Sequence, residues 1–181
     1  KGGHGSLSLT ESIMKSCNVA MMRIGAMMGS GIFAKYQAMF GMGQKTGIDL
    51  PGEADAAGLV YPADKMGPTE LATNAFGQNY NCTMIQMAAA LCSVINGGSY
   101  YEPHVVRQIL NEQGSVVETK DPVLVRETVS QSTADYLKEA MFQTVENGTG
   151  GAAKVAGYQV GGKTGTAEKQ PRSAKNYLVS F

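Results

Sequence analysis

The chain has 181 residues, which is the length of one domain or of a piece of a larger one. Its 43% apolar and 17% charged residues are typical of a globular chain that buries a core. The 15 Lys and Arg residues are balanced by 15 Asp and Glu residues, which argues against a nucleic-acid binder, because such proteins present a basic face to phosphates. Three cysteines without C-x-x-C spacing exclude a disulfide framework and a zinc ribbon.

Capping patterns and apolar spacing predict mostly helix over residues 1–150, with a turn-rich crossing over 41–68. Ser8 with Glu11, and Thr83 with Gln86, form capping-box patterns, in which each side chain bonds the backbone N–H of the other residue. Helices are expected over residues 9–15, 19–28, 32–40, from about 69, 84–96 and 132–147. Because residues 19–28 are apolar on several faces, this helix is expected to be central and buried.

β-Structure is expected in two places. Residues 105–110 and 115–119 flank the turn sequence Asn111–Gly114 and predict a β-hairpin. In the tail, residues 158–160 and 176–181 carry the β-branched and aromatic residues of paired strands. The chain is therefore expected to be one α+β unit, helical over 1–150 with a hairpin near 103–119, and β-stranded over 155–181.

Residues 157–164 match the P-loop pattern G-x-x-x-x-G-K-[ST]. A P-loop needs a helix that begins at the lysine, because the helix N-terminus and the glycine amides bind the phosphates. Here Gly165 follows, and the next residues have no apolar helical period. A P-loop nucleotide binder is therefore kept only as an alternative.

Lys163-Thr164-Gly165-Thr166 combines a cation, two hydroxyls and a glycine. On a strand, these groups make a platform for a carboxylate beside a backbone donor. The alternative is a glycine-rich hairpin with a surface lysine. The same tripeptide recurs at residues 45–47, among turn residues, and this copy is interpreted as structural.

Two further motifs adjoin each other near the N-terminus. Ser16 and Asn18 can face one cleft, the hydroxyl relaying a proton and the amide gripping a substrate amide; helix capping is the alternative interpretation. Ser12 and Lys15 match S-x-x-K, the nucleophile motif of the penicillin-interacting serine enzymes. Because both motifs would share one turn of chain, whereas the constellation needs separate elements, Ser12 is interpreted as a chance match.

Several segments together resemble the transpeptidase domain of class B penicillin-binding proteins. They are residues 5–20, 46–53, 76–78, 83–90, 96–98, 147–150, 161–168 and 179–181. Their order and approximate spacing agree with the family along the whole chain. The resemblance implies an α+β, partial serine β-lactamase/D,D-transpeptidase-like fold, mostly helical, with a C-terminal β-hairpin that carries K-T-G. In the family, the S-x-x-K serine lies upstream of an S-x-N motif, which Ser16 and Asn18 match here. The resemblance therefore also implies an internal fragment that lacks the nucleophile and the membrane anchor.

The resemblance assigns catalytic roles to three residues. Ser16 would relay a proton between nucleophile and leaving group, Asn18 would bind the backbone of the donor peptide, and Lys163 would supply positive charge. Residues 164–166 would bind substrate: the Thr164 and Thr166 hydroxyls would bind its carboxylate, the Thr166 N–H would complete the oxyanion hole, and Gly165 would leave room for the peptide.

The activity implied for the parent protein is serine-type D,D-transpeptidation, an acyl transfer that cross-links peptidoglycan. Its partners would be stem peptides ending in D-Ala-D-Ala and β-lactam antibiotics, with no nucleic acid, no cofactor and no metal. The parent protein would work at the extracytoplasmic face of the bacterial cell membrane. The fragment alone is expected to be inactive and, with an incomplete sheet, to self-associate. A β-lactam sensor, a β-lactamase and a non-catalytic cell-wall scaffold are the alternatives.

Overall fold

The computed structural model describes residues 3–168 and 177–180. The chain falls into two compact units. The first unit consists of Lys1–Phe33, Pro62–Tyr80 and Asp135–Phe181, and the second consists of Ala34–Tyr61 and Asn81–Ala134. All the residues of the S-x-N motif and of the C-terminal K-T-G motif belong to the first unit.

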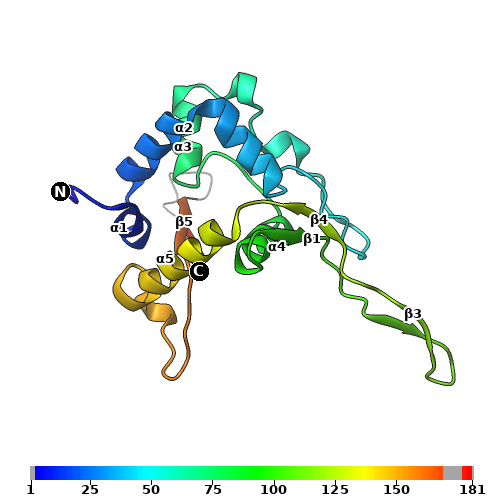
Figure 1. Ribbon diagram of the computed structural model, residues 1–181. Coiled ribbons are helices and arrows are strands. Elements are labelled where there is room, and N and C mark those ends of the chain that lie inside the picture. Colours follow the sequence, from blue (N-terminus) through cyan, green and yellow to red (C-terminus); the bar gives the residue numbers. More distant parts are fainter. Residues whose placement is uncertain (1–2, 169–176, 181) are drawn as a thin grey trace. The chain divides into compact units, whose positions relative to one another are not determined.

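The first unit contains α1 (Leu9–Met14), α3 (Pro68–Ala75), the short helix η2 (Ala63–Lys65), and parts of α2 (Asn18–Met39) and α5 (Gln131–Asn147) (Figure 1). The predicted capping box of α1 is confirmed: Glu11 N–H donates to Ser8 Oγ at 3.2 Å, and Ser8 N–H donates to Glu11 Oε2 at 2.8 Å. The predicted break after residue 28 is also confirmed, because Gly29 has a non-helical φ of 76° within α2.

The prediction of a buried helix over residues 19–28 was wrong. Val19 is 57% exposed and Met27 is 87% exposed. This part of α2 packs closely on α3 at Gly25, where an added Cβ would lie only 2.7 Å from the Cβ of Ala75. The contact uses one face of the helix, so the apolar side chains on other faces stay in solvent.

The second unit is organised around α4 (Met84–Ile95) and β1 (Ser99–Tyr101). The capping box between Thr83 and Gln86 is confirmed at 3.0 and 3.2 Å. The buried face of α4 consists of Gln86, Ala89, Ala90, Ser93 and Val94. The β1 residue Tyr100 is 3% exposed and stacks with the guanidinium of Arg126, 4.5 Å from the ring centre.

The predicted hairpin is confirmed as β2 (Gln108–Leu110) paired antiparallel with β3 (Val116–Thr119), and it projects from the second unit (Figure 1). A second antiparallel pair, β1 with β4 (Leu124–Glu127), was not predicted. The second unit also contains the short helix η1 (Ala57–Leu59). The expected turn-rich crossing is confirmed, since η1 and η2 are the regular elements assigned over residues 41–67, all of which the structure describes.

The C-terminal hairpin consists of β5 (Gly165–Glu168) and β6 (Tyr177–Ser180), preceded by the short helix η3 (Gly151–Ala153). The predicted strand over 158–160 was wrong, because residues 158–164 form a bend and irregular backbone. Asn176 and Phe181, the predicted ends of the last strand, lie outside the described residues. Helix α5 begins at Gln131 rather than at 132, and Ser130 Oγ accepts from Thr133 N–H at 3.3 Å.

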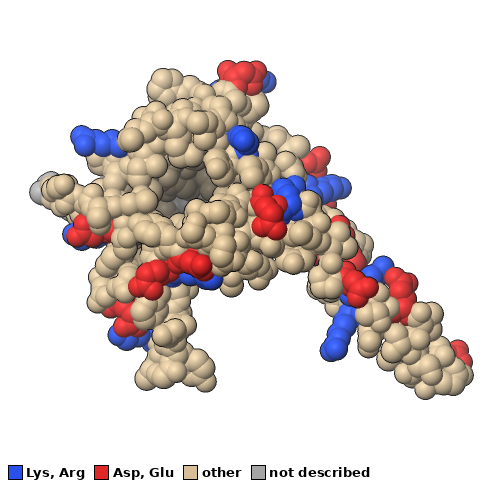
Figure 2. Space-filling model, viewed as in Figure 1, with Lys and Arg blue, Asp and Glu red and all other residues tan. Residues whose placement is uncertain are grey.

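Charges of both signs are interspersed on the face shown in Figure 2. No large basic area is seen on that face, which agrees with the balanced composition. Within the described residues, none of the helices has the length and apolarity to cross a membrane.

Candidate active site

Ser16 occupies the turn between α1 and α2. Its N–H donates to the Ile13 carbonyl, and the next N–H, that of Cys17, donates to the Ser12 carbonyl, both at 3.0 Å. These two bonds are the Schellman ending of a helix, which places Ser16 at the position that usually holds glycine. Ser16 accordingly has a φ of +47°, in the left-handed region. For an L-residue this conformation costs about 1–2 kcal/mol, and such strain is found preferentially at functional sites.

Lys163 reaches this turn from a position 147 residues away in the chain. Its Nζ donates to Ser16 Oγ at 2.7 Å and to the Thr164 carbonyl at 2.9 Å. Partial burial disfavours the charged ammonium and holds the pKa of Lys163 below its ordinary value of 10.5. The arrangement joins a hydroxyl to an amine that gives up its proton more readily than a free lysine, which is suited to moving a proton through the hydroxyl.

The lowered pKa of Lys163 predicts that stability depends on pH. Between the folded pKa and the ordinary value of 10.5, the unfolded chain binds more protons than the folded chain. The free energy of unfolding is therefore expected to rise with pH across this window. Urea unfolding at about pH 8 and about pH 10 would measure the rise, and Lys163→Met is expected to reduce it. An equal rise in the variant would contradict the assignment.

The strand that carries the K-T-G motif begins two residues after the start of the motif, at Gly165 rather than at Lys163. Gly165 is the first residue of β5 and pairs with Ser180, and Thr166 pairs with Val179. Lys163 and Thr164 lie just before the strand. Thr166 is exposed, and its carbonyl accepts a hydrogen bond from Gln78 Nε2 at 3.2 Å.

Asn18 is the first residue of α2 and is exposed. It lines a cavity of about 840 Å³ together with Ser12, Ser16 and Arg23. Asn18 and Ser16 therefore face one hollow, as their spacing predicts.

Thr149 is a site residue that the sequence reasoning missed. Its hydroxyl lies 2.9 Å from the Thr164 hydroxyl, and its N–H donates to the Met14 carbonyl at 3.1 Å. The neighbouring Gly148 permits this approach, because an added Cβ would lie 2.6 Å from the same carbonyl. The loop after α5 thus connects the end of α1, two residues before Ser16, with the K-T-G segment. Residues 147–150 are among the segments that resemble the family, but the sequence alone assigned no role to Thr149.

Ser12 lines the same cavity as Ser16, but its hydroxyl is occupied within its own helix. It is 3% exposed, and its hydroxyl donates to the Ser8 carbonyl at 2.8 Å, within its own helix. Lys15 is the C-terminal cap of α1 and is exposed. These contacts favour a structural role for Ser12.

The first K-T-G copy holds a carboxylate of the chain itself. Thr46 donates to Glu53 Oε1 through its N–H at 2.5 Å and its hydroxyl at 2.7 Å, and Gly47 N–H donates to Glu53 Oε2 at 3.2 Å. The Thr46 backbone hydrogen bond is the main cause that lowers the pKa of Glu53. The structural interpretation of this copy is confirmed by these contacts.

The P-loop interpretation lacks its structural context. Residues 154–164 contain no strand, and a strand rather than a helix follows Lys163. Within the described part of the chain, no group of three His, Cys, Asp or Glu residues is placed to hold a metal ion.

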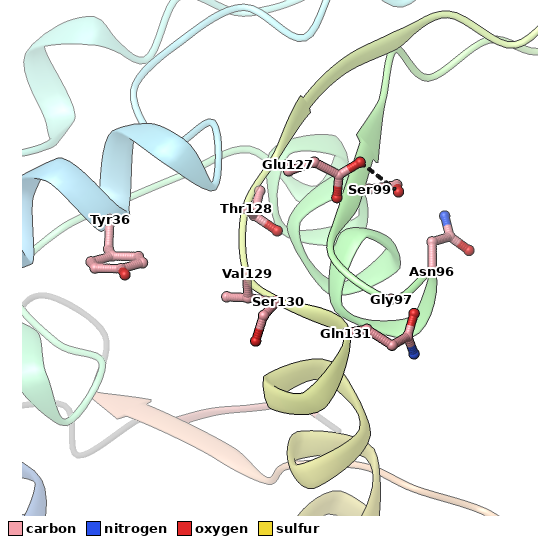
Figure 3. A pocket seen from close by; sticks show the side chains of 9 residues that line it. All are labelled: Tyr36, Asn96, Gly97, Ser99, Glu127, Thr128, Val129, Ser130 and Gln131. Atoms are coloured by element: carbon pink, nitrogen blue, oxygen red, sulfur yellow. Dashed lines mark hydrogen bonds between the residues drawn. The ribbon is translucent and has the colours of Figure 1, made fainter.

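The second unit has a pocket of its own (Figure 3). Its volume is about 590 Å³, and Glu127 at its wall accepts from Ser99 Oγ at 3.0 Å. The other lining residues are Tyr36, Asn96, Gly97, Thr128, Val129, Ser130 and Gln131. None of the predicted site residues lies in this pocket.

A serine hydroxyl bonded to a lysine ammonium, beside a strand that begins in K-T-G, is an arrangement of the serine enzymes that interact with penicillin. The family model described as the penicillin binding protein transpeptidase domain matches residues 1–181. The chain belongs to this family, as its motifs predict.

Relatives and solved structures agree with this assignment. The chain is 38% identical over 185 residues to Stage V sporulation protein D of Bacillus subtilis, covering 100% of this chain and 28% of that protein. It is 29% identical over 188 residues to the peptidoglycan D,D-transpeptidase MrdA of Acinetobacter baumannii, covering 98% and 28%. The chain thus spans less than a third of the length of these relatives.

Among solved structures, the D,D-transpeptidase domain of a peptidoglycan glycosyltransferase from Eggerthella lenta matches with a TM-score of 0.83 at 28% identity, covering 94% of this chain and 44% of that one. Penicillin binding protein 3 of Mycobacterium tuberculosis, complexed with aztreonam, matches with a TM-score of 0.81 at 29% identity, covering 94% and 39%. The expected fold class, α+β and related to penicillin-binding transpeptidase domains, is therefore confirmed.

Proposed function

We propose that this chain is part of the transpeptidase domain of a peptidoglycan D,D-transpeptidase. The nucleophile is a serine N-terminal to the residues printed here, and this chain supplies the proton relay and the carboxylate site. The observation that carries the proposal is the 2.7 Å hydrogen bond from Lys163 Nζ to Ser16 Oγ. It joins the two motifs across 147 positions, in a geometry that can pass a proton to a leaving group.

The roles proposed for the individual residues are those that the family resemblance implies, and the contact between Lys163 and Ser16 supports them. Lys163 lowers the cost of a negative charge near Ser16, and Ser16 passes the proton from the nucleophile to the leaving amine. Thr164 and Thr166 donate to the ligand carboxylate, and the Thr166 N–H supplies one oxyanion donor. Asn18 hydrogen-bonds the peptide backbone of the donor, whose chain lies along β5 where Gly165 has no side chain.

The substrate proposed is a peptidoglycan stem peptide ending in D-Ala-D-Ala, cross-linked at the extracytoplasmic face of the cell membrane. β-Lactams acylate the same serine. Aztreonam and ampicillin are bound in solved structures of a related protein, which supports this part of the proposal. We further propose that the chain alone is inactive and that it self-associates; light scattering that finds a monodisperse monomer would contradict the self-association.

The test is the intact mass after incubation with benzylpenicillin, measured on this chain and on one extended at its N-terminus. An adduct on the extended chain alone is expected. An adduct on the short chain that maps to Ser12 would show that the nucleophile had been misassigned. The absence of an adduct on both chains would contradict the proposed function and indicate a non-catalytic homologue that does not form an acyl-enzyme.

Replacing Ser12 with alanine is expected to change the acylation rate of the extended chain by no more than about threefold. The Ser8 carbonyl keeps its bond from the Ser12 N–H at 2.9 Å, and alanine is the best helix former. Stopped-flow acylation by benzylpenicillin measures the rate. An inactive but folded variant would assign Ser12 a role in the chemistry.

Replacing Thr149 with valine is expected to weaken carboxylate binding about 3- to 10-fold. A Thr149 hydroxyl that donates to Thr164 leaves the Thr164 proton free for the ligand, and one hydrogen bond of this kind is worth about 1 kcal/mol. The measurement compares acylation by benzylpenicillin with acylation by its methyl ester, which has no carboxylate. Thr149→Ser is expected to restore the rate.

The matched control for Thr149 is Thr10→Val. The Thr10 hydroxyl lies 2.7 Å from the Tyr136 hydroxyl, in the same unit but apart from the motifs. This variant is expected to leave both rates unchanged. An equal loss for benzylpenicillin and its ester in Thr149→Val would contradict a role in carboxylate binding.

A further inference from the structure

Gln78 makes a long-range contact that none of the motifs explains. Its side-chain Nε2 donates to the Thr166 carbonyl at 3.2 Å, across 88 positions of the chain. Both residues belong to the first unit. Thr166 pairs with Val179 of β6, so Gln78 approaches the strand from an element outside the C-terminal hairpin.

The backbone of Gln78 is fixed independently of this contact. Its N–H donates to the Thr73 carbonyl, and the Gly77 N–H donates to the Asn74 carbonyl, both at 2.9 Å. With Gly77 at a φ of +87°, these bonds form the Schellman ending of α3. The side chain therefore extends toward β5 from a backbone that the end of a helix holds in place.

The carboxamide N–H of glutamine is chemically the same donor as a peptide N–H. When an extended peptide adds to the edge of a strand, its N–H groups donate to the carbonyls of that strand. The Thr166 carbonyl accepts such a bond, and in the ligand-free chain Gln78 provides it.

We propose that Gln78 is a specificity-determining residue, which competes with the amide N–H of the ligand for the Thr166 carbonyl. This inference rests on the proposed function, because it requires that the ligand lie along β5. A ligand that carries an amide donor beside its reactive carbonyl must displace the carboxamide or share the acceptor with it. A ligand without that donor leaves the Gln78 contact in place.

The test uses the N-terminally extended protein and two probes. Benzylpenicillin has an acylamino side chain, whereas imipenem carries a hydroxyethyl group at the corresponding ring position. Gln78→Met keeps the length of the side chain but removes its donor. The variant is expected to be acylated by benzylpenicillin about 3- to 10-fold faster, since about 1 kcal/mol of competing hydrogen bond is lost. The rate with imipenem is expected to stay unchanged.

Two further variants make the result specific. Gln78→Asn keeps the carboxamide but is one methylene too short to reach Thr166, and it is expected to give the same gain. Gln143→Met is the matched control, because the Gln143 carboxamide bonds Glu139 and Asn147 of its own helix. It is expected to change neither rate.

The outcomes separate this inference from the proposed function. If the unsubstituted protein is not acylated by either probe, the proposed function fails. If it is acylated but the Gln78 variants react more slowly, or change equally with both probes, Gln78 is a structural clamp and the inference is overturned. If Gln78→Met does not fold, the ratio of the benzylpenicillin rate to the imipenem rate is measured on Gln78→Asn instead. A raised ratio supports the inference, and an unchanged ratio overturns it.

Discussion

Replacing Lys163 with alanine is expected to slow acylation of the extended protein by benzylpenicillin by roughly 10³-fold. The variant loses the ammonium that donates to Ser16 Oγ at 2.7 Å, and with it the positive charge beside the ligand carboxylate. Both losses act on the reaction, so the second-order acylation rate constant is the quantity to measure. The free energy of unfolding is expected to change little, because Lys163 keeps much of its surface in solvent.

The control for Lys163 comes from the same chain. Lys45 precedes the same Thr-Gly pair, but the Thr and Gly of that copy already bind Glu53. Lys45→Ala is expected to leave the acylation rate within about twofold of the unsubstituted protein. If Lys163→Ala were also acylated at a near-normal rate, the catalytic assignment of the C-terminal motif would fail.

Replacing Ser16 with glycine is expected to raise the stability of the fold and to lower the acylation activity. Glycine adopts the left-handed conformation without the Cβ penalty, so the free energy of unfolding is expected to rise by about 0.5–1 kcal/mol. The same change removes the hydroxyl that Lys163 contacts, and acylation is expected to fall by about 10²–10⁴. A residue that costs stability and supports activity is a known compromise at functional sites.

Ser16→Ala is the matched comparison, since it removes the hydroxyl but keeps the Cβ. It is expected to lose as much activity as the glycine variant without gaining its stability. Urea unfolding and acylation kinetics on the two variants give both quantities. Equal stability of the two variants would show that the turn at Ser16 stores no strain, and retained acylation in either would remove Ser16 from the relay.

The elements that could be predicted from the sequence are those defined by local rules. Both capping boxes link residues three positions apart, and the hairpin of β2 and β3 is closed by its own turn. The pairing of β1 with β4 joins Ser99 to Glu127 and depends on tertiary packing, so no local pattern indicated it. The strand expected over 158–160 was wrong although its local pattern was favourable: Tyr158 and Val160 are typical of strands, but none of the described strands pairs with them.

The candidate site shows the same limit. The residues of the S-x-N and K-T-G motifs were selected by their resemblance to a family, and the distance between Ser16 and Lys163 came only with the fold. The roles proposed for Thr149 and Gln78 each rest on one side-chain hydrogen bond among the described residues, and their residue types are common on protein surfaces. The strain at Ser16 was likewise not apparent in the sequence, because serine is an ordinary residue near helix ends.

The Glu53 carboxylate already occupies the first K-T-G copy, and it would compete there with a soluble carboxylate. Glu53 is tethered six residues from Gly47, so its effective concentration at that tripeptide is in the millimolar range or above. A free carboxylate at micromolar concentration would have to outcompete this internal ligand. Under the proposed function, the C-terminal tripeptide is the copy that is open to soluble carboxylates, and saturation with a carboxylate-bearing antibiotic is expected to show a single class of site.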